Sequence, residues 1–157
     1  SRDWSSDVCS SDLGNKCKPE CITNNNNTAL IWACKNNLEN VAILLIEKFG
    51  DKCNPQCINK NNETALIWAC KNNLENVAIL LIENFGDNCK PDIIDYYGYT
   101  ALLYACKNNL ENIAILLIEK FGDKYNPNDV NKQKYMAQIS KYYKIINRKK
   151  LKKYGKI

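Results

Sequence analysis

The sequence predicts an all-α fold, a solenoid of stacked helix-turn-helix repeats. The block at residues 28–47 recurs without change at 64–83, and at 100–119 it keeps seventeen of its twenty residues. The blocks start 36 residues apart, and a unit of that length cannot bury its own apolar face unless neighbouring units stack on it. Glycine and proline follow the same period, at Gly14, Gly50, Gly86 and Gly122 and at Pro19, Pro55, Pro91 and Pro127.

Each unit reads as two short helices joined by a tight turn. Thr28 is a good cap for the first helix, because its hydroxyl can accept a hydrogen bond from an unsatisfied N–H of the first turn. The asparagine pair at 36–37 ends that helix, since asparagine tolerates the left-handed conformation. The second helix spans about 38–49 and stops at Gly50, and its nearly continuous apolar stretch predicts burial on more than one side. The Asn-, Pro- and Lys-rich segment 51–62 suits a turn and a projecting finger.

These motifs resemble those of the ankyrin-repeat family. T-A-L-I-W-A-C looks like the family's T-P-L-H-x-A-A, with Ala29 for proline and Ile31 for histidine. N-N-L-E-N-V-A-I-L-L-I-E is similar to G-H-L-E-x-V-x-x-L-L-L, and F-G-D is similar to the G-A-D that ends the family's repeat. The resemblance covers roughly residues 14–140 and implies an ankyrin-type fold. The family's period is about 33 residues, so the extra residues, around Phe49 and at 52–56, imply long finger loops.

The N-terminal segment departs from the repeat. In register, residues 7–13 would resemble I-L-L-I-E-K-F, but they read D-V-C-S-S-D-L. We interpret residues 1–13 as a non-native leader that arose from translated sequencing-adapter read-through, and we leave them out of the fold prediction. We expect further repeats to have preceded Gly14.

At the other end we expect the repeats to extend over 14–134 and a capping helix with a basic tail to occupy 135–157. Residues 1–130 hold 12 basic and 17 acidic side chains, a balance of 12 − 17 = −5, whereas 131–157 hold ten basic residues and no acidic one. The apolar side of the cap is Tyr135, Ile139, Tyr142 and Ile146, and its polar side is Lys134, Lys141, Lys144 and Arg148.

Composition excludes several function classes. The chain has no histidine, which removes Ser-His, Cys-His and His-ligated metal chemistry. The longest apolar run, 41–46, is far shorter than the about 20 residues of a membrane span, and no secretory signal is visible. We therefore expect no catalytic residues, no cofactor and no metal, an intracellular location in the cytoplasm or nucleus, and a monomer.

The cysteines form two periodic sets. Cys34, Cys70 and Cys106 stand where the resembled family has its second alanine, so we expect them to be small buried side chains. Cys17 and Cys21 form a C-x₃-C pair that Cys53 and Cys57 repeat. Zinc or redox crosslinking is conceivable there, but stacked fingers are too far apart to share one tetrahedral ion, which favours plain loop packing.

Aromatic and charged residues mark the candidate binding surface. The third finger changes from polar to aromatic around Gly98, and we expect its tyrosines to project and to anchor a partner. The aromatic residues of the first helices are either partner anchors or a packing ladder, with a row of solvated lysines beside them at Lys35, Lys71 and Lys107. The candidate contact residues are Tyr96, Tyr97, Tyr99, Trp32, Trp68, Tyr104, Lys60 and Glu63.

The family resemblance implies protein–protein recognition without catalysis, through finger tips and inner helices. One alternative is a targeting fragment of a larger regulatory protein. A second alternative is that the basic tail binds nucleic acid, some other anionic polymer or an anionic membrane. The simpler interpretation of the tail is a solvated, partly disordered end. The tail residues are Arg148, Lys149, Lys150, Lys152 and Lys153.

Overall fold

The computed structural model describes residues 18–125 and 132–153. The predicted leader at 1–13 and the repeat start at Gly14 lie outside this part. The first unit consists of α2 (Ala29–Lys35) and α3 (Glu39–Phe49), the second of α4 (Ala65–Lys71) and α5 (Glu75–Phe85), and the third of α6 (Ala101–Lys107) and α7 (Glu111–Phe121). Short 3₁₀ turns follow the second helices, η1 (Gly50–Cys53), η2 (Gly86–Cys89) and η3 (Gly122–Lys124), and α8 (Lys132–Lys153) completes the order.

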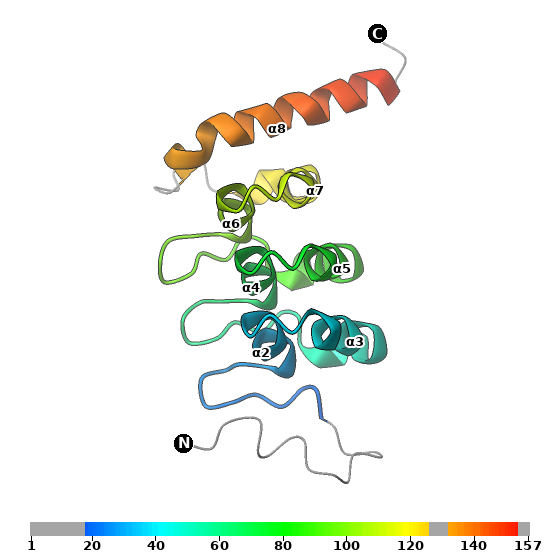
Figure 1. The fold of residues 1–157 in the computed structure, drawn as a ribbon, viewed down its shortest axis with the longest axis vertical. Coiled ribbons are helices and arrows are strands. Elements are labelled where there is room, and N and C mark those ends of the chain that lie inside the picture. The colour runs from blue at the N-terminus through cyan, green and yellow to red at the C-terminus, as the bar shows by residue number, and fades with distance from the viewer. Residues whose placement is uncertain (1–17, 126–131, 154–157) are drawn as a thin grey trace.

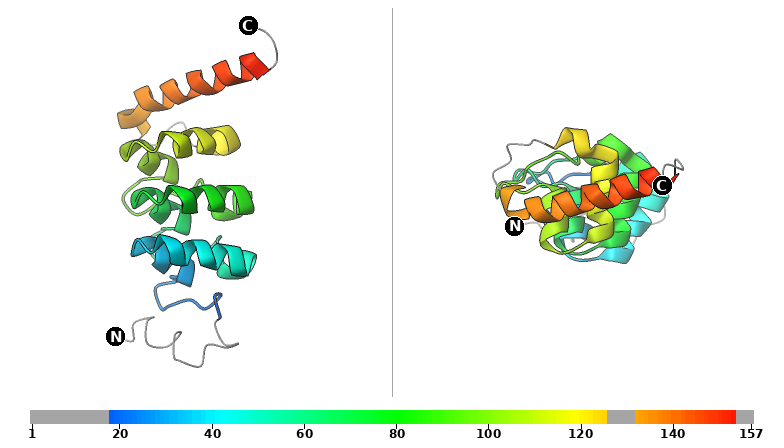
Figure 2. Two further views of the ribbon diagram at one scale, coloured as in Figure 1. Left: turned by 45° about the vertical axis from the view of Figure 1, so that its right-hand side comes forward. Right: turned by 90° about the horizontal axis from the view of Figure 1, so that it is seen from above.

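The units stack in two columns (Figure 1). The inner column contains α2, α4 and α6, and the outer column contains α3, α5 and α7, with helices of one column packed on each other from unit to unit. The fingers project side by side from the inner column, and α8 lies across the last unit against both α6 and α7 (Figure 2). The prediction of an all-α repeat solenoid is confirmed.

The helix boundaries follow from local chemistry. Thr28 Oγ1 accepts a hydrogen bond from the Ile31 N–H at 3.1 Å, and Thr64 and Thr100 cap their helices in the same way. Such a cap satisfies one of the donors that a helix start leaves open. Asn37 ends the first inner helix in the left-handed conformation, with φ of 58°, so the predicted break is confirmed.

A 3₁₀ turn after each outer helix contains residues that make this repeat longer than the family's usual one. Gly50 ends α3 with φ of 50°, a value that few side chains tolerate, and η1 begins there. Asn54 then turns the chain with a second left-handed residue, φ of 52°, and Lys90 does the same in the next unit, with φ of 54°. The added residues therefore shape the passage from the outer helix to the finger.

The core is a continuous column of aliphatic side chains and thiols. Cys34, Cys70 and Cys106 are buried as predicted, and Cys53 and Cys89 are buried beside them from the 3₁₀ turns. Burial raises the pKa of all these thiols above the ordinary value of 9.0, to about 11 for Cys53 and about 12 for Cys89 and Cys106.

Alkali should therefore destabilise the fold. Above pH 9 an unfolded thiol loses its proton while a buried one keeps it, so the folded state binds more protons and stability falls as pH rises towards the folded pKa values. Each thiol contributes up to about 1.4 kcal/mol per pH unit in this range. We expect the melting temperature to decline steadily from pH 8.5 to 10.5. The triple variant with alanine at Cys34, Cys70 and Cys106 should show a shallower decline, and equal slopes would contradict the assignment.

Two helices differ from the sequence prediction. The expected burial of the second helix on more than one side fits α7 but is wrong for α3, where Val41 and Leu44 are exposed. The described part of α8 runs unbroken to Lys153, so the basic cluster lies on a helix and not in an irregular end. The predicted apolar side of α8 is buried and its predicted polar side is exposed, each as the four-residue sets given above.

Candidate binding groove and fingers

One side chain organises the turn of each finger at the repeat period. Thr23 Oγ1 accepts hydrogen bonds from the backbone N–H groups two and four residues further on, at 3.3 and 3.1 Å. Asn59 Oδ1 accepts the equivalent pair at 2.9 Å each, and so does Asp95 Oδ1. Side chains that bond the backbone two residues on are a common way to fix a turn. Each finger tip is therefore held by bonds of its own.

Backbone hydrogen bonds also join neighbouring fingers. The Lys60 N–H donates to the Asn25 carbonyl oxygen at 3.1 Å, and the Tyr96 N–H donates to the Asn61 carbonyl oxygen at 3.1 Å. These bonds fix the second finger against the first and the third against the second. The side chain of Lys60 is itself exposed at the second tip. The fingers thus form one connected surface.

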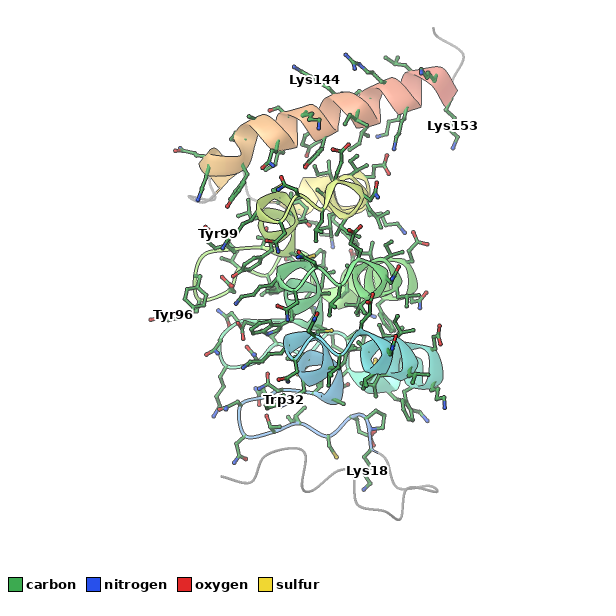
Figure 3. The ribbon with its side chains drawn as sticks, in the orientation of Figure 1. Lys18, Trp32, Tyr96, Tyr99, Lys144 and Lys153 are labelled. Atoms are coloured by element: carbon green, nitrogen blue, oxygen red, sulfur yellow. The ribbon has the colours of Figure 1, made fainter. Side chains whose placement is uncertain are left out.

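The third finger presents two of its three tyrosines. Tyr96 is 81% exposed and Tyr97 is 66% exposed, and their rings meet edge to face with centroids 5.9 Å apart. Figure 3 shows Tyr96 at the outer edge of this finger. The expectation that all three project is wrong for Tyr99, which is half-buried with its ring 5.1 Å from that of Tyr104. The exposed anchor is therefore a tyrosine pair.

Lysines lie between the aromatic residues of the inner column. Lys35 Nζ is 5.8 Å from the ring centroid of Trp32 and 5.4 Å from that of Trp68. Lys71 Nζ lies closer, 4.2 Å from the Trp68 centroid. Ammonium groups within about 6 Å of a ring are attracted by its negative face. The two tryptophan Nε1 atoms are buried and have no hydrogen-bond partner among the described residues.

The same alternation continues into the third unit. Lys71 Nζ is also 5.4 Å from the centroids of Tyr97 and Tyr104, and Lys107 Nζ is 5.4 Å from Tyr99 and 5.8 Å from Tyr104. The rings thus form neither isolated anchors nor a simple aromatic stack. We call this set the aromatic–lysine ladder: Trp32, Lys35, Trp68, Lys71, Tyr104 and Lys107.

Two predicted contact residues lie beneath the surface. Glu63 is buried, accepts a hydrogen bond from Asn59 Nδ2 at 3.0 Å and has an oxygen 3.7 Å from Lys71 Nζ. Tyr104 is also buried, and its hydroxyl donates to Asp95 Oδ2 at 2.7 Å. Burial, and then the bond to this carboxylate, raise the pKa of Tyr104 well above its ordinary value. Both residues therefore position the exposed groups around them.

Removing the Asp95 carboxylate should loosen the third finger. Asp95→Ala leaves two backbone N–H groups and the Tyr104 hydroxyl without their acceptor, and unsatisfied buried donors cost about 1–3 kcal/mol. We expect chemical denaturation to show a loss of that size, and hydrogen exchange to quicken at residues 97 and 99. The exposed Asp92 offers a control, since Asp92→Ala should change stability by less than about 0.5 kcal/mol. Equal effects of both substitutions would contradict this role of Asp95.

Two hollows lie along the ladder. One, of about 380 Å³, lies between the second and third fingers and is lined by Lys35, Asn61, Glu63, Trp68, Lys71, Tyr96 and Tyr97. The other, of about 320 Å³, is lined by Lys71, Tyr97, Tyr99, Tyr104, Lys107 and Asn108. The candidate residues of the second and third units therefore converge on one groove, with Tyr97 and Lys71 on both hollows. Sequence reasoning missed Asp95 as the support of this groove, although its position in register with Asn59 was a usable signal.

The basic cluster is separate from the groove. Its residues, Arg148 to Lys153, are exposed at the far end of α8, and Figure 3 shows Lys144 and Lys153 on that helix. Among the described lysines of α8, Lys141 forms an ion pair with the repeat stack: its Nζ lies 3.1 Å from Glu111 Oε2.

The described part of the chain contains neither a cluster of metal ligands nor a membrane-spanning helix. Within 18–125 and 132–153, no three cysteine or carboxylate side chains are grouped as a metal ion would require. Cys17 lies outside these ranges, and the Cys57 thiol bonds the Asn26 carbonyl oxygen at 3.3 Å. No helix in the described ranges is both long and apolar enough to span a membrane.

The fold and the groove define a helical-repeat protein that displays rigid fingers beside a concave surface. Comparison with protein-family models gives matches to ankyrin repeats (three copies) over residues 5–92 and 49–130. The chain therefore belongs to the ankyrin-repeat family, as the sequence motifs predicted. A search of curated proteins gave no match. Ankyrin-repeat domains generally mediate protein–protein interaction and are typically non-catalytic.

Proposed function

We propose that the aromatic–lysine ladder and the third finger bind an extended acidic segment of a partner protein. The observation that carries this proposal is the alternation of ammonium groups and rings along one groove, next to the exposed pair Tyr96 and Tyr97. Carboxylates of the partner would meet the lysines, and its apolar or aromatic side chains would pack on the tyrosines.

The repeat spacing limits the pattern of the partner. Packed helices lie about 8–10 Å apart, and each unit supplies one ladder lysine. An extended chain in the polyproline II conformation rises about 3.1 Å per residue with three residues per turn, so an acidic residue at every third position would lie on one side and match successive lysines. Lys71 already has Glu63 beside it, whereas Lys35 and Lys107 are the more exposed members. We therefore assign the main charge contacts to Lys35 and Lys107.

The proposal also covers the oligomeric state, the absence of catalysis and the location of the chain. We propose that the chain acts as a monomeric, non-catalytic module inside the cell, a setting in which buried free thiols such as Cys34 and Cys70 persist. The module could equally serve as the targeting part of a larger regulatory protein, since a binding groove would do the same work there.

Panning a displayed library of short random peptides against the chain tests the groove. We expect the selected peptides to carry acidic residues six positions apart, the spacing that two repeats set between Lys35 and Lys107. The double variant Lys35→Gln/Lys107→Gln should weaken their binding by about tenfold or more, that is by about 1.4 kcal/mol. Lys48→Gln, an exposed lysine on the outer helix α3, is the matched control and should leave affinity unchanged.

The same experiment addresses the second candidate, anionic binding by α8. That candidate rests on the exposed basic cluster at the end of the helix. Loss of peptide binding when Lys149, Lys150, Lys152 and Lys153 are changed to glutamine, with the groove variant still active, would move the site to α8. A steep fall of affinity with salt would then be expected.

A further inference from the structure

The two hollows of the groove differ in the charges on their walls. The first is lined by Lys35 and Lys71 but also by the carboxylate of Glu63. The second, of about 320 Å³, is lined by Lys71 and Lys107, and none of its described lining residues is acidic. Its other lining residues are Tyr97, Tyr99, Tyr104 and Asn108. The second hollow therefore presents two ammonium groups among aromatic rings.

Both ammonium groups lie near the same ring. Lys71 Nζ is 5.4 Å from the ring centroid of Tyr104, and Lys107 Nζ is 5.8 Å from it. The two lysines come from the ends of successive inner helices, α4 and α6. Each has a flexible four-carbon stem, so its ammonium group can follow an anion that is placed between the two.

The N–H donors of these lysines are available to a ligand. Lys71 Nζ is 3.7 Å from Glu63, longer than a hydrogen bond of about 3.2 Å or less. Lys107 is exposed and forms no ion pair with the described residues. Each ammonium group has three donors, whereas one carboxylate brings two oxygens and a single charge. A phosphate monoester brings three oxygens and a charge of about −1.5 to −2 at pH 7, which matches the lysine pair better.

The rings around the hollow are held in place from beneath. Asp95 is buried, and its Oδ1 accepts hydrogen bonds from the N–H groups of Tyr97 and Tyr99 at 2.9 Å each. Its Oδ2 accepts a hydrogen bond from the Tyr104 hydroxyl at 2.7 Å. Both carboxylate oxygens are thus used within the protein. A wall that is fixed before binding reduces the ordering cost of association.

The aromatic wall favours a ligand that itself carries a ring. The rings of Tyr99 and Tyr104 have centroids 5.1 Å apart, and Tyr97 is 66% exposed. A further ring can pack against such side chains at a centroid distance of about 4.5–7 Å. Small-ligand pockets measure roughly 300–1,000 Å³, so the second hollow is large enough for an aromatic side chain.

We propose that the second hollow binds a phosphotyrosine side chain of the partner segment. Its phosphate would lie between Lys71 and Lys107, and its ring would pack on Tyr97 and Tyr99. This inference rests on the proposed function, because it names the acidic residue that meets Lys107 in the same groove. Recognition would then depend on phosphorylation of the partner.

Short synthetic peptides with one fixed central residue and random flanks test this assignment. Separate sets carry phosphotyrosine, glutamate, phosphoserine or sulfotyrosine at the centre. The best phosphotyrosine peptide should bind the full chain about tenfold or more tightly than the best glutamate peptide, because hydrogen bonds between charged groups are strong and the phosphate adds a second charge. Phosphoserine lacks the ring and sulfotyrosine lacks the second charge, so both should bind more weakly than phosphotyrosine.

Two lysine variants locate the site. Lys107→Gln removes one ammonium group of the second hollow and should remove the preference for phosphotyrosine over glutamate. Lys35 lines the first hollow and not the second, so Lys35→Gln is the matched control and should leave that preference unchanged. Both lysines are exposed, so neither variant should change the melting temperature.

The possible failures separate the two proposals. Equal affinity of the best glutamate or sulfotyrosine peptide would overturn the phosphotyrosine assignment and leave the acidic-segment proposal standing. Phosphotyrosine binding that survives Lys107→Gln would also overturn it, because the phosphate would then lie elsewhere on the chain. Failure of every set to bind, together with the panned acidic peptides, would overturn both proposals.

Discussion

Replacing Leu81 by alanine is expected to lower the free energy of unfolding by about 2–4 kcal/mol, the range for large-to-small changes in a core. Leu81 is fully buried in α5, the outer helix that lies between α3 and α7. The substitution removes apolar contacts with neighbours on both sides and leaves a cavity that the stacked helices cannot close. Denaturant unfolding followed by helical circular dichroism measures the loss.

A matched control lies in the first unit. Leu44→Ala makes the same change on α3, where the side chain is exposed, and should cost less than about 1 kcal/mol. A loss below about 1 kcal/mol for Leu81→Ala as well would contradict the packing described for the middle unit.

Changing Tyr96 and Tyr97 to serine should weaken binding of the selected acidic peptides by more than about 2 kcal/mol, which is the scale of an interface hot spot. Both rings are mostly exposed and lie beside the ladder, with Tyr97 5.4 Å from Lys71. The double variant removes apolar contact area and one aromatic neighbour of that ammonium group. Isothermal titration of one selected peptide against both proteins measures the change.

The tyrosine variant has an internal control for folding. Its turn is organised by Asp95 through backbone N–H groups, which serine retains, so the melting temperature should be unchanged. A second control is Tyr143→Ser on α8, an exposed tyrosine far along the chain from the groove. Unaltered affinity of the double variant in a folded protein would exclude the third finger as an anchor.

Most of the fold could be predicted because its determinants are local and repeated. Thr28 caps a helix through a bond to a residue three positions away, and Asn37 ends it through its own backbone conformation. These effects depend on short stretches of sequence. The repeat then supplies the long-range order, because each unit must stack on a copy of itself.

The candidate site could be predicted only in part. The sequence shows which residues are the tyrosines of the third finger and the row of lysines, but it does not predict how far each side chain is buried. Tyr104 is buried because its hydroxyl reaches Asp95 nine residues earlier, a contact that depends on how the finger folds back. Likewise, no local pattern separates Val41 from Val77, since identical sequences surround both. Their difference arises from neighbours along the stack.

The aromatic–lysine ladder also has a consequence for how such a gene can change. Each unit brings one lysine and one large ring to the groove, and two units share an identical block of twenty residues. In-frame gain or loss of one such unit through recombination would preserve every interface between neighbours, because the new junction joins the same surfaces as the old one. The groove would lengthen or shorten by one lysine and one ring at a time. The length of ligand that the groove can contact would therefore change by whole repeats from one gene variant to the next, while each repeat supplies the same residue types.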